Sequence, residues 1–312
     1  MPLFNRRHFV QTLALAAAGS GWKPLHARGT AVPLSKQLAQ NNRFKISLNA
    51  YSFNALLTKN ATSLEELIDF CAETGFDAID TTGYYFPGYP AKPASDYIYR
   101  LRLKAHKAGI AISGTGIRND FGDPDPAKIR EQVDFVKEWI DVAVQLGAPV
   151  LRVFSAKTLP ANHSWEEACD WIAQAFRTCA DYGAAKGIIV AMQNHNDFIK
   201  TANQAITMMQ RVNHPWFGLI LDTGSFASED PYTAIQQTTP WAVNWQIKER
   251  LTINGKTADM DLHKLCSIIR DCNYRGYLPI ETLSPGDPFT IVPPFYRKVA
   301  ETLAAVMAEK KD

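Results

Sequence analysis

From residue 43 onward, the chain repeats one pattern: a short run rich in β-branched and aromatic residues is followed by a longer segment with helical spacing of its apolar residues. Strands that alternate with helices form parallel sheets, and eight such units in roughly 270 residues suffice for a closed barrel, which typically takes about 250 residues. The sequence therefore predicts a (β/α)8 TIM barrel over residues 43–312, with a doubly wound sheet carrying extra strands as the alternative. The predicted strands span 44–53, 76–82, 110–117, 149–156, 188–195, 217–224, 242–249 and 277–283.

The predicted helices carry start and stop signals. A serine followed three residues later by a glutamate is typical of a capping box, and a glycine after the last apolar position is typical of a helix end. The capping-box pairs are Ser63 with Glu66 and Ser164 with Glu167, and the closing glycines are Gly75, Gly109, Gly147 and Gly187.

The N-terminus has the pattern of an export signal rather than of a folded element. Arg6 and Arg7 precede a mildly apolar stretch and then small residues, with Leu25 to Ala27 as a candidate cleavage site. Residues 1–27 therefore resemble a twin-arginine signal peptide, followed by a linker at 28–42. This predicts a periplasmic protein with no stable membrane anchor after cleavage; the alternative is an uncleaved amphipathic arm.

Charge and cysteine content exclude several classes of partner. The net charge is +2, and no block of Lys or Arg follows the first residues, so a nucleic-acid partner is not expected. The five cysteines include no CxxC pair, which argues against a zinc knuckle or a disulfide framework. Small buried side chains are the expected role of these cysteines.

Four apolar runs in the second half of the chain each end on a polar group, namely Gln193, Asp222, Gln246 and Glu281. The C-terminal ends of the strands form the active-site face of a TIM barrel, so these four side chains are expected to converge. Side chains alternate along a strand, so His195 should share the face of Gln193, and Lys248 that of Gln246. Other strand-end candidates are Asn49, Tyr51, Thr81, Thr82, Arg118, Asn119 and Arg152.

The stretches QNH, LDTGS, WQIKE and PIE, which contain these four residues, resemble motifs of the xylose isomerase-like barrel superfamily. This group includes sugar isomerases, tagatose-type epimerases and, more distantly, AP endonucleases of the endonuclease IV type. Its members usually carry EnH, lDtgH, HvKD and iE, whose Glu, Asp, His and Glu hold one divalent ion. The resemblance implies that Gln193, Asp222, Gln246 and Glu281 are the metal-site positions of this chain.

Two of these positions carry amides, which weakens the implied metal site. A glutamine carbonyl can bind Mn²⁺, Mg²⁺ or Ca²⁺ through oxygen, but it supplies no charge. Weak binding of one of these divalent ions is therefore expected, and a zinc site is not. The alternative is that the metal site has decayed and that Gln193 and Gln246 only form hydrogen bonds.

The amides also limit proton transfer. The family's epimerases exchange protons through two glutamates, and Gln193 cannot titrate, so Glu281 is left as the principal base. His195 and Lys248 are the expected partners of Glu281 for the acid and oxyanion roles. An inward Arg152 would need an anion or an acid partner, either in a ligand or in a salt-bridge network.

Aromatic and polar strand-end residues are expected to contact the substrate. Tyr84, in the loop from Gly83 to Pro90, and Trp245 offer faces on which a sugar ring could stack, although aromatic residues often only pack loops onto barrels. Arg152, Asn49, Tyr84 and Trp245 are therefore the predicted substrate-binding residues.

The resemblance implies an isomerase or epimerase that acts on a carbohydrate or keto-sugar by proton transfer next to a carbonyl. The alternatives are a lyase that cleaves keto-glycosides and a non-catalytic periplasmic sugar-binding barrel that has lost its metal. A homo-oligomer is compatible with the sequence.

Overall fold

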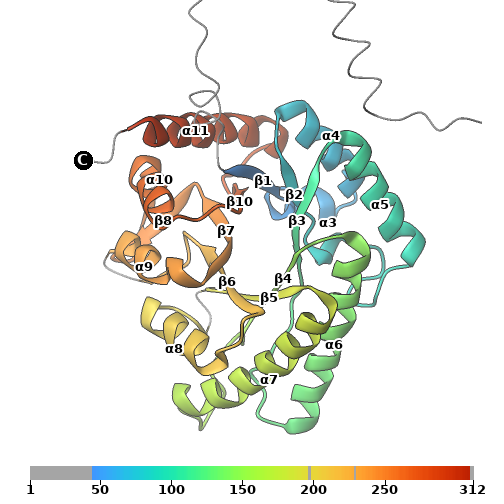
Figure 1. Cartoon of the computed structure of the whole chain (residues 1–312), viewed down its shortest axis with the longest axis vertical. Helices are drawn as coiled ribbons and strands as arrows, with labels where there is room; N and C mark the ends of the chain where they lie inside the picture. The colour runs from blue at the N-terminus through green and yellow to red at the C-terminus, as the bar shows by residue number, and fades with distance from the viewer. Residues whose placement is uncertain (1–43, 196–197, 228–229, 310–312) are drawn as a thin grey trace, which may run out of the picture. The chain divides into compact units, whose positions relative to one another are not determined.

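The structure is a computed structural model that describes residues 44–195, 198–227 and 230–309; the predicted signal and linker lie outside them. Parallel strands close into a barrel in the order β1-β10-β7-β6-β5-β4-β3-β2, with helices around the outside (Figure 1). This confirms the predicted (β/α)8 barrel. The barrel strands are β1 (Lys45–Asn49), β2 (Ala78–Asp80), β3 (Ala111–Gly116), β4 (Val150–Val153), β5 (Ile189–Gln193), β6 (Phe217–Asp222), β7 (Ala242–Lys248) and β10 (Tyr277–Glu281).

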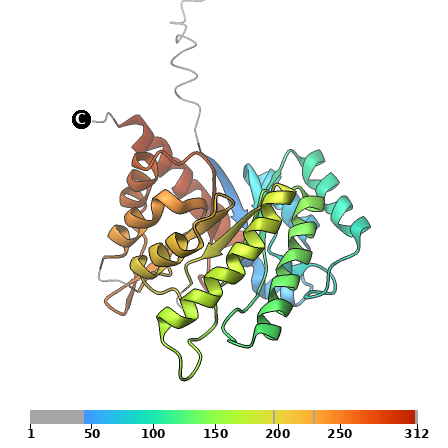
Figure 2. The same ribbon diagram turned by 60° about the horizontal axis from the view of Figure 1, so that its bottom comes forward.

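The helices follow the strands in the predicted alternation. The long helices α6 and α7 pack side by side on the outside of the barrel (Figure 2). No helix in the described part of the chain has the length and apolar character to cross a membrane. The main helices are α4 (Leu64–Thr74), α5 (Ser95–Ala108), α6 (Pro126–Leu146), α7 (Trp165–Lys186), α8 (Ala202–Val212), α9 (Pro231–Thr238), α10 (Leu262–Asp271) and α11 (Pro288–Ala308).

Both predicted capping boxes are present at the starts of α4 and α7. The four predicted closing glycines have a left-handed backbone, which a residue without a Cβ adopts without strain. Helix α11 begins at Pro288, because the Asp287 side chain accepts a hydrogen bond from the amide of Phe289 at 3.1 Å and Pro288 occupies the first turn.

A hairpin that the sequence analysis omitted follows β7 directly. Strands β8 (Arg250–Ile253) and β9 (Lys256–Asp259) are antiparallel and are joined by Asn254 and Gly255, both with positive φ. Asn-Gly is the preferred pair for such a two-residue turn, so the signal was present in the sequence. The hairpin places Glu249 and Arg250 at the rim of the barrel beside the end of β7.

The barrel interior changes from apolar to polar along its axis. Val150, Ala191 and Ile220 form an apolar cluster that is separate from the main core. A polar layer contains the Ser47 and Ser113 hydroxyls, 2.7 Å apart, and Asn244, whose amide donates to the carbonyl of Ser113 at 3.3 Å. The barrel is thus filled by side chains, and its polar groups lead toward the C-terminal strand ends.

Candidate active site

The four polar residues at or near the ends of β5, β6, β7 and β10 lie on adjacent strands and point into the barrel. Asp222 and Glu281 are 0% and 1% exposed, and the two glutamines are 4% and 6% exposed. A buried carboxylate needs hydrogen-bond donors or a cation beside it, and each acid has both. The predicted convergence of Gln193, Asp222, Gln246 and Glu281 is present in the structure.

Both carboxylate oxygens of Asp222 accept hydrogen bonds from nitrogen donors. Nε2 of Gln193 donates to Oδ2 of Asp222 at 2.7 Å, and the amide of Gly224 donates to Oδ1 at 3.0 Å. The side chain of Asn194 pairs with the backbone of Asp222: its Nδ2 donates to the carbonyl at 2.9 Å, and its Oδ1 accepts from the amide at 2.8 Å. Asn194 is a positioning residue that the sequence analysis missed, although it lies between two residues that were named.

Glu281 bonds to a second amide and to an ammonium group. Nε2 of Gln246 donates to Oε2 of Glu281, and Nζ of Lys248 donates to Oε1. The same Nζ lies 3.5 Å from Oδ2 of Asp222, so Lys248 bridges the two carboxylates. The hydroxyl of Thr223 donates to the carbonyl of Gln246 at 3.2 Å and accepts from the amide of Lys248 at 3.0 Å, which holds β6 against β7.

Burial and charge act in opposite directions on the pKa values of Lys248 and Glu281. Burial acts to lower the pKa of Lys248, but the charges of Asp222 and Glu281 outweigh it, and the pKa is raised. Burial also raises the pKa of Glu281, and the charge of Lys248 offsets this only in part. Lys248 is therefore a cation at neutral pH, and Glu281 is a stronger base than an exposed glutamate.

The donor set does not fit the divalent ion that the resemblance implies. No cluster of three or more His, Cys, Asp or Glu side chains able to hold an ion occurs within residues 44–195, 198–227 and 230–309. Both glutamines direct an NH₂ group at a carboxylate, and an amide NH₂ has no lone pair to offer a cation. The ammonium of Lys248 already lies between the two acids.

The guanidinium group of Arg152 on β4 lies beside Gly116 of β3. This group donates to the carbonyl of Ile117 and to the hydroxyl of Tyr84, both at 2.6 Å, and lies 4.3 Å from the ring centre of Phe154. A Cβ on Gly116 would lie 2.7 Å from its Nε, so only glycine leaves this space. A carbonyl, a phenol and an aromatic face thus surround this cation.

Asp80 is a buried acid at the end of β2 that the sequence analysis also passed over. Burial raises its pKa, and the charge of Arg152 and a hydrogen bond from the amide of Thr82 act in the opposite direction. Its neighbours Thr81 and Thr82 were named from the strand end, and the same alternation could have identified Asp80. Arg152 thus acts on this acid through its charge.

Residues from the strand ends and the loops after them surround a cavity of 180 Å³ at the mouth of the barrel. An outer cavity of 290 Å³ adjoins it and shares His195, Lys248 and Glu281. The ring of His195 contacts the edge of Phe154, with 5.3 Å between the ring centres. The inner cavity is lined by Asn49, Tyr51, Thr82, Tyr84, Arg118, Arg152, Phe154, Gln193, His195, Gln246, Lys248, Glu281 and Leu283.

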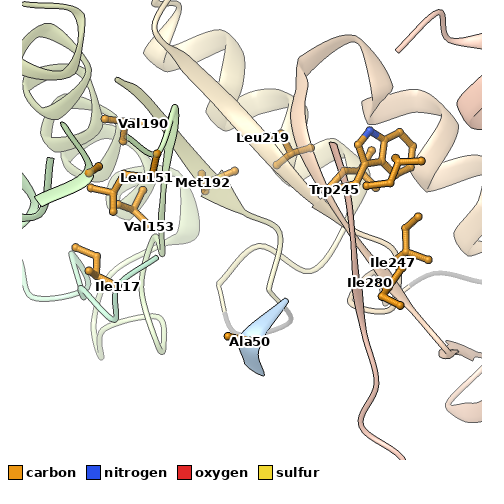
Figure 3. Close-up of a cluster of buried hydrophobic side chains, with 14 of the residues drawn as sticks. Ala50, Ile117, Leu151, Val153, Val190, Met192, Leu219, Trp245, Ile247 and Ile280 are labelled. Atoms are coloured by element: carbon orange, nitrogen blue, oxygen red, sulfur yellow. The ribbon is translucent and has the colours of Figure 1, made fainter. Parts of the chain in front are cut away.

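Three predicted substrate contacts, Asn49, Tyr84 and Arg152, line the inner cavity, and the fourth does not. Tyr84 packs edge-on against Tyr51 at 6.4 Å, and Oδ1 of Asn49 accepts a hydrogen bond from the amide of Tyr51 at 2.9 Å. Trp245, expected to face a sugar, lies instead on the outward face of β7, where it is 1% exposed and packs in the apolar core (Figure 3). Side chains alternate along β7, so the inward positions of Gln246 and Lys248 place Trp245 outside the barrel.

A loss of the Arg152 contacts is expected from Gly116→Ala. The added methyl group would meet Nε of Arg152, so the guanidinium must leave the carbonyl of Ile117. Because Arg152 lines the cavity, we expect KM for substrate to rise by about tenfold, the loss of one ordinary polar contact, with a smaller change in kcat. Steady-state kinetics would measure this. An unchanged KM would show that Arg152 does not bind substrate.

Comparison with known proteins agrees with this architecture. A family model described as a xylose isomerase-like TIM barrel matches residues 68–305. No curated protein matches the chain. Among solved structures, the chain is similar to a D-allulose 3-epimerase from Methylomonas sp., with TM-score 0.68 and 18% identity over 84% of this chain and 99% of that chain.

Two further structures share the same fold. An L-ribulose 3-epimerase is similar with TM-score 0.69 and 16% identity over 84% of this chain and 95% of that chain. A 3-keto-D-glucoside 4-epimerase from E. coli is similar with TM-score 0.60 and 14% identity over 84% of this chain and 98% of that chain. At such identities these likenesses show the fold, and the match of the family model over residues 68–305 shows that the chain belongs to the xylose isomerase-like TIM barrel family.

Proposed function

We propose that the chain is an enzyme of the sugar isomerase and epimerase type, which moves a proton on the carbon next to a carbonyl of a sugar or keto-sugar. The observation that carries this proposal is the pair of Glu281 and Lys248 at the cavity, a buried carboxylate in contact with an ammonium group. Removal of a proton next to a carbonyl requires a base and a positive group for the oxygen that becomes charged. The two side chains supply one of each.

In this mechanism Glu281 takes the proton from the carbon next to the carbonyl. The electron pair of the C–H bond moves into the enolate, and the ammonium of Lys248 stabilises the charge on its oxygen. The proton then returns from Glu281 to the former carbonyl carbon. His195, at the junction of the two cavities, gives a proton to the former carbonyl oxygen and takes one from the neighbouring hydroxyl, which becomes the new carbonyl. Tyr84, Arg152 and Asn49 bind the remaining hydroxyls.

The single base distinguishes this site from a two-glutamate epimerase. Gln193 occupies the position of the second glutamate, and an amide takes up no proton near neutral pH. One base can shuttle a proton between adjacent carbons, which is an isomerisation, or start an elimination. Inversion of a carbon would need His195 or Lys248 on the opposite face of the sugar.

The names of the similar structures support the substrate class. They are epimerases of allulose, of ribulose and of a 3-keto-glucoside, and each name specifies a sugar. A lyase acting on keto-glycosides is the second candidate, because the outer cavity leaves room beside Glu281 for a second group. That space is lined by Gly224, Ser225, Glu249, Arg250 and Ser284 in addition to His195, Lys248, Glu281 and Leu283, which the two cavities share.

Proton exchange in D₂O tests the proposal directly. Keto-sugars and keto-glycosides would be incubated with the full chain, and loss of the proton next to the carbonyl would be followed by NMR. The proposal expects exchange of that proton, with isomerised sugar or an eliminated aglycone as the product. Saturable binding of the same sugars without exchange would contradict an enzyme and favour the sugar-binding barrel.

We also propose that the chain is exported to the periplasm, because Arg6 and Arg7 precede an apolar stretch in the pattern of a twin-arginine signal. The double variant Arg6→Lys/Arg7→Lys keeps the charge and is expected to hold the protein in the cytoplasm. Immunoblots of fractionated cells would measure this, with Arg28→Lys as the control outside the predicted signal. Equal periplasmic amounts of the two variants would refute the route.

A further inference from the structure

We propose that the amides of Gln193 and Gln246 abolish the family's metal site, so that this active site binds no metal ion and the ammonium group of Lys248 supplies the positive charge between Asp222 and Glu281. An ion shared by Asp222 and Glu281 would have to lie between their carboxylates. Nζ of Lys248 occupies that region, bonded to Oε1 of Glu281 and 3.5 Å from Oδ2 of Asp222. The lysine side chain is 13% exposed and both acids are 1% exposed, so little water screens these charges.

The carboxylate oxygens are already used by nitrogen donors. Oδ1 of Asp222 accepts from Gly224, and Oδ2 accepts from Gln193. Oε1 of Glu281 accepts from Lys248, and Oε2 accepts from Gln246. A hard cation binds through oxygen lone pairs, so it would have to displace these donors.

The net charge of the site also argues against a bound divalent ion. Two carboxylates and one ammonium leave a single net negative charge among Asp222, Glu281 and Lys248. The family's usual ligand set has three carboxylates, whereas the amides at 193 and 246 add no charge. The site therefore attracts a divalent ion less than the family's ligand set does, and an ammonium close to the ion would repel it.

This arrangement gives Lys248 a defined chemical task. An ammonium offers one positive charge and N–H donors to an enolate oxygen, in place of a Lewis acid. That task in turnover rests on the proposed function. The exclusion of a metal ion does not, because it can be measured without any substrate.

Binding of Mn²⁺ to the full chain, after dialysis against EDTA, tests the inference. Free Mn²⁺ would be measured by electron paramagnetic resonance and Tm by thermal unfolding, since an ion that binds only the folded state raises Tm as its concentration rises. We expect the wild type to leave free Mn²⁺ and Tm unchanged at millimolar ion. Stoichiometric binding with a rise in Tm would overturn the inference.

One variant gives the matching positive result. Gln193→Glu/Gln246→His restores the residue types of the family's motifs and keeps Lys248, so the inference expects this double variant to bind Mn²⁺. Gln210→Glu/Gln237→His makes the same changes on exposed helix positions and should bind none. Failure of the folded Gln193→Glu/Gln246→His variant to bind Mn²⁺ would contradict the inference, while failure of the sugar screen alone would refute only the proposed reaction.

Discussion

Glu281→Gln is expected to lower the rate of proton exchange by about 10²–10⁴-fold, the usual contribution of a general base. Glutamine has the same shape. Its oxygen can accept the hydrogen bond from Lys248, and its NH₂ can donate to the oxygen of Gln246 once that amide turns over, but it cannot take up a proton. The barrel should therefore stay folded while turnover is lost. NMR exchange rates measured beside circular dichroism spectra would separate these two effects.

The control for this variant is Glu138→Gln, which makes the same change at an exposed position on α6. It should exchange protons at the wild-type rate. Exchange by Glu281→Gln at that rate would reject Glu281 as the base, and the search for one would turn to His195.

Lys248→Met is expected to lower both stability and activity. The change leaves Asp222 and Glu281 buried without their cation, and removal of one partner of a buried ion pair typically costs about 3–5 kcal/mol. The free energy of unfolding should fall by about that amount in metal-free buffer, as measured by urea denaturation. Proton exchange should fall by about 10²–10³-fold, as when a single oxyanion donor is removed.

Lys107→Met is the matched control, because Lys107 is an exposed residue of α5. Its unfolding curve and exchange rate should equal those of the wild type. Wild-type stability of Lys248→Met in metal-free buffer would mean that the ammonium does not neutralise the two carboxylates.

Most of the fold could be predicted from periodicity. Each barrel strand is a short β-rich run between amphipathic helices, and the capping residues Ser63 and Ser164 fixed two helix starts. The hairpin after β7 was omitted because its strands are short and half exposed, so they lack a clear alternation. The start of α11 depended on Asp287, whose side chain accepts a hydrogen bond from the amide of Phe289 in the first turn of the helix.

The positions of the main site residues could be predicted from the strand ends and from the alternation of side chains along each strand. They identified Gln193, Asp222, Gln246 and Glu281, and the same alternation, applied to β7, would have placed Trp245 outside the barrel. The side-chain pairing could not be predicted. A lysine at the end of β7 can point to solvent or to either acid, and only distances show that Lys248 lies between both.

Proton exchange in D₂O with EDTA present is the most direct test of the central claim, which is that Glu281 and the ammonium of Lys248 perform the reaction without a divalent ion. The account predicts that the wild type exchanges the proton next to the carbonyl at the same rate with EDTA and with added Mn²⁺. Exchange that EDTA abolishes and Mn²⁺ restores would contradict it.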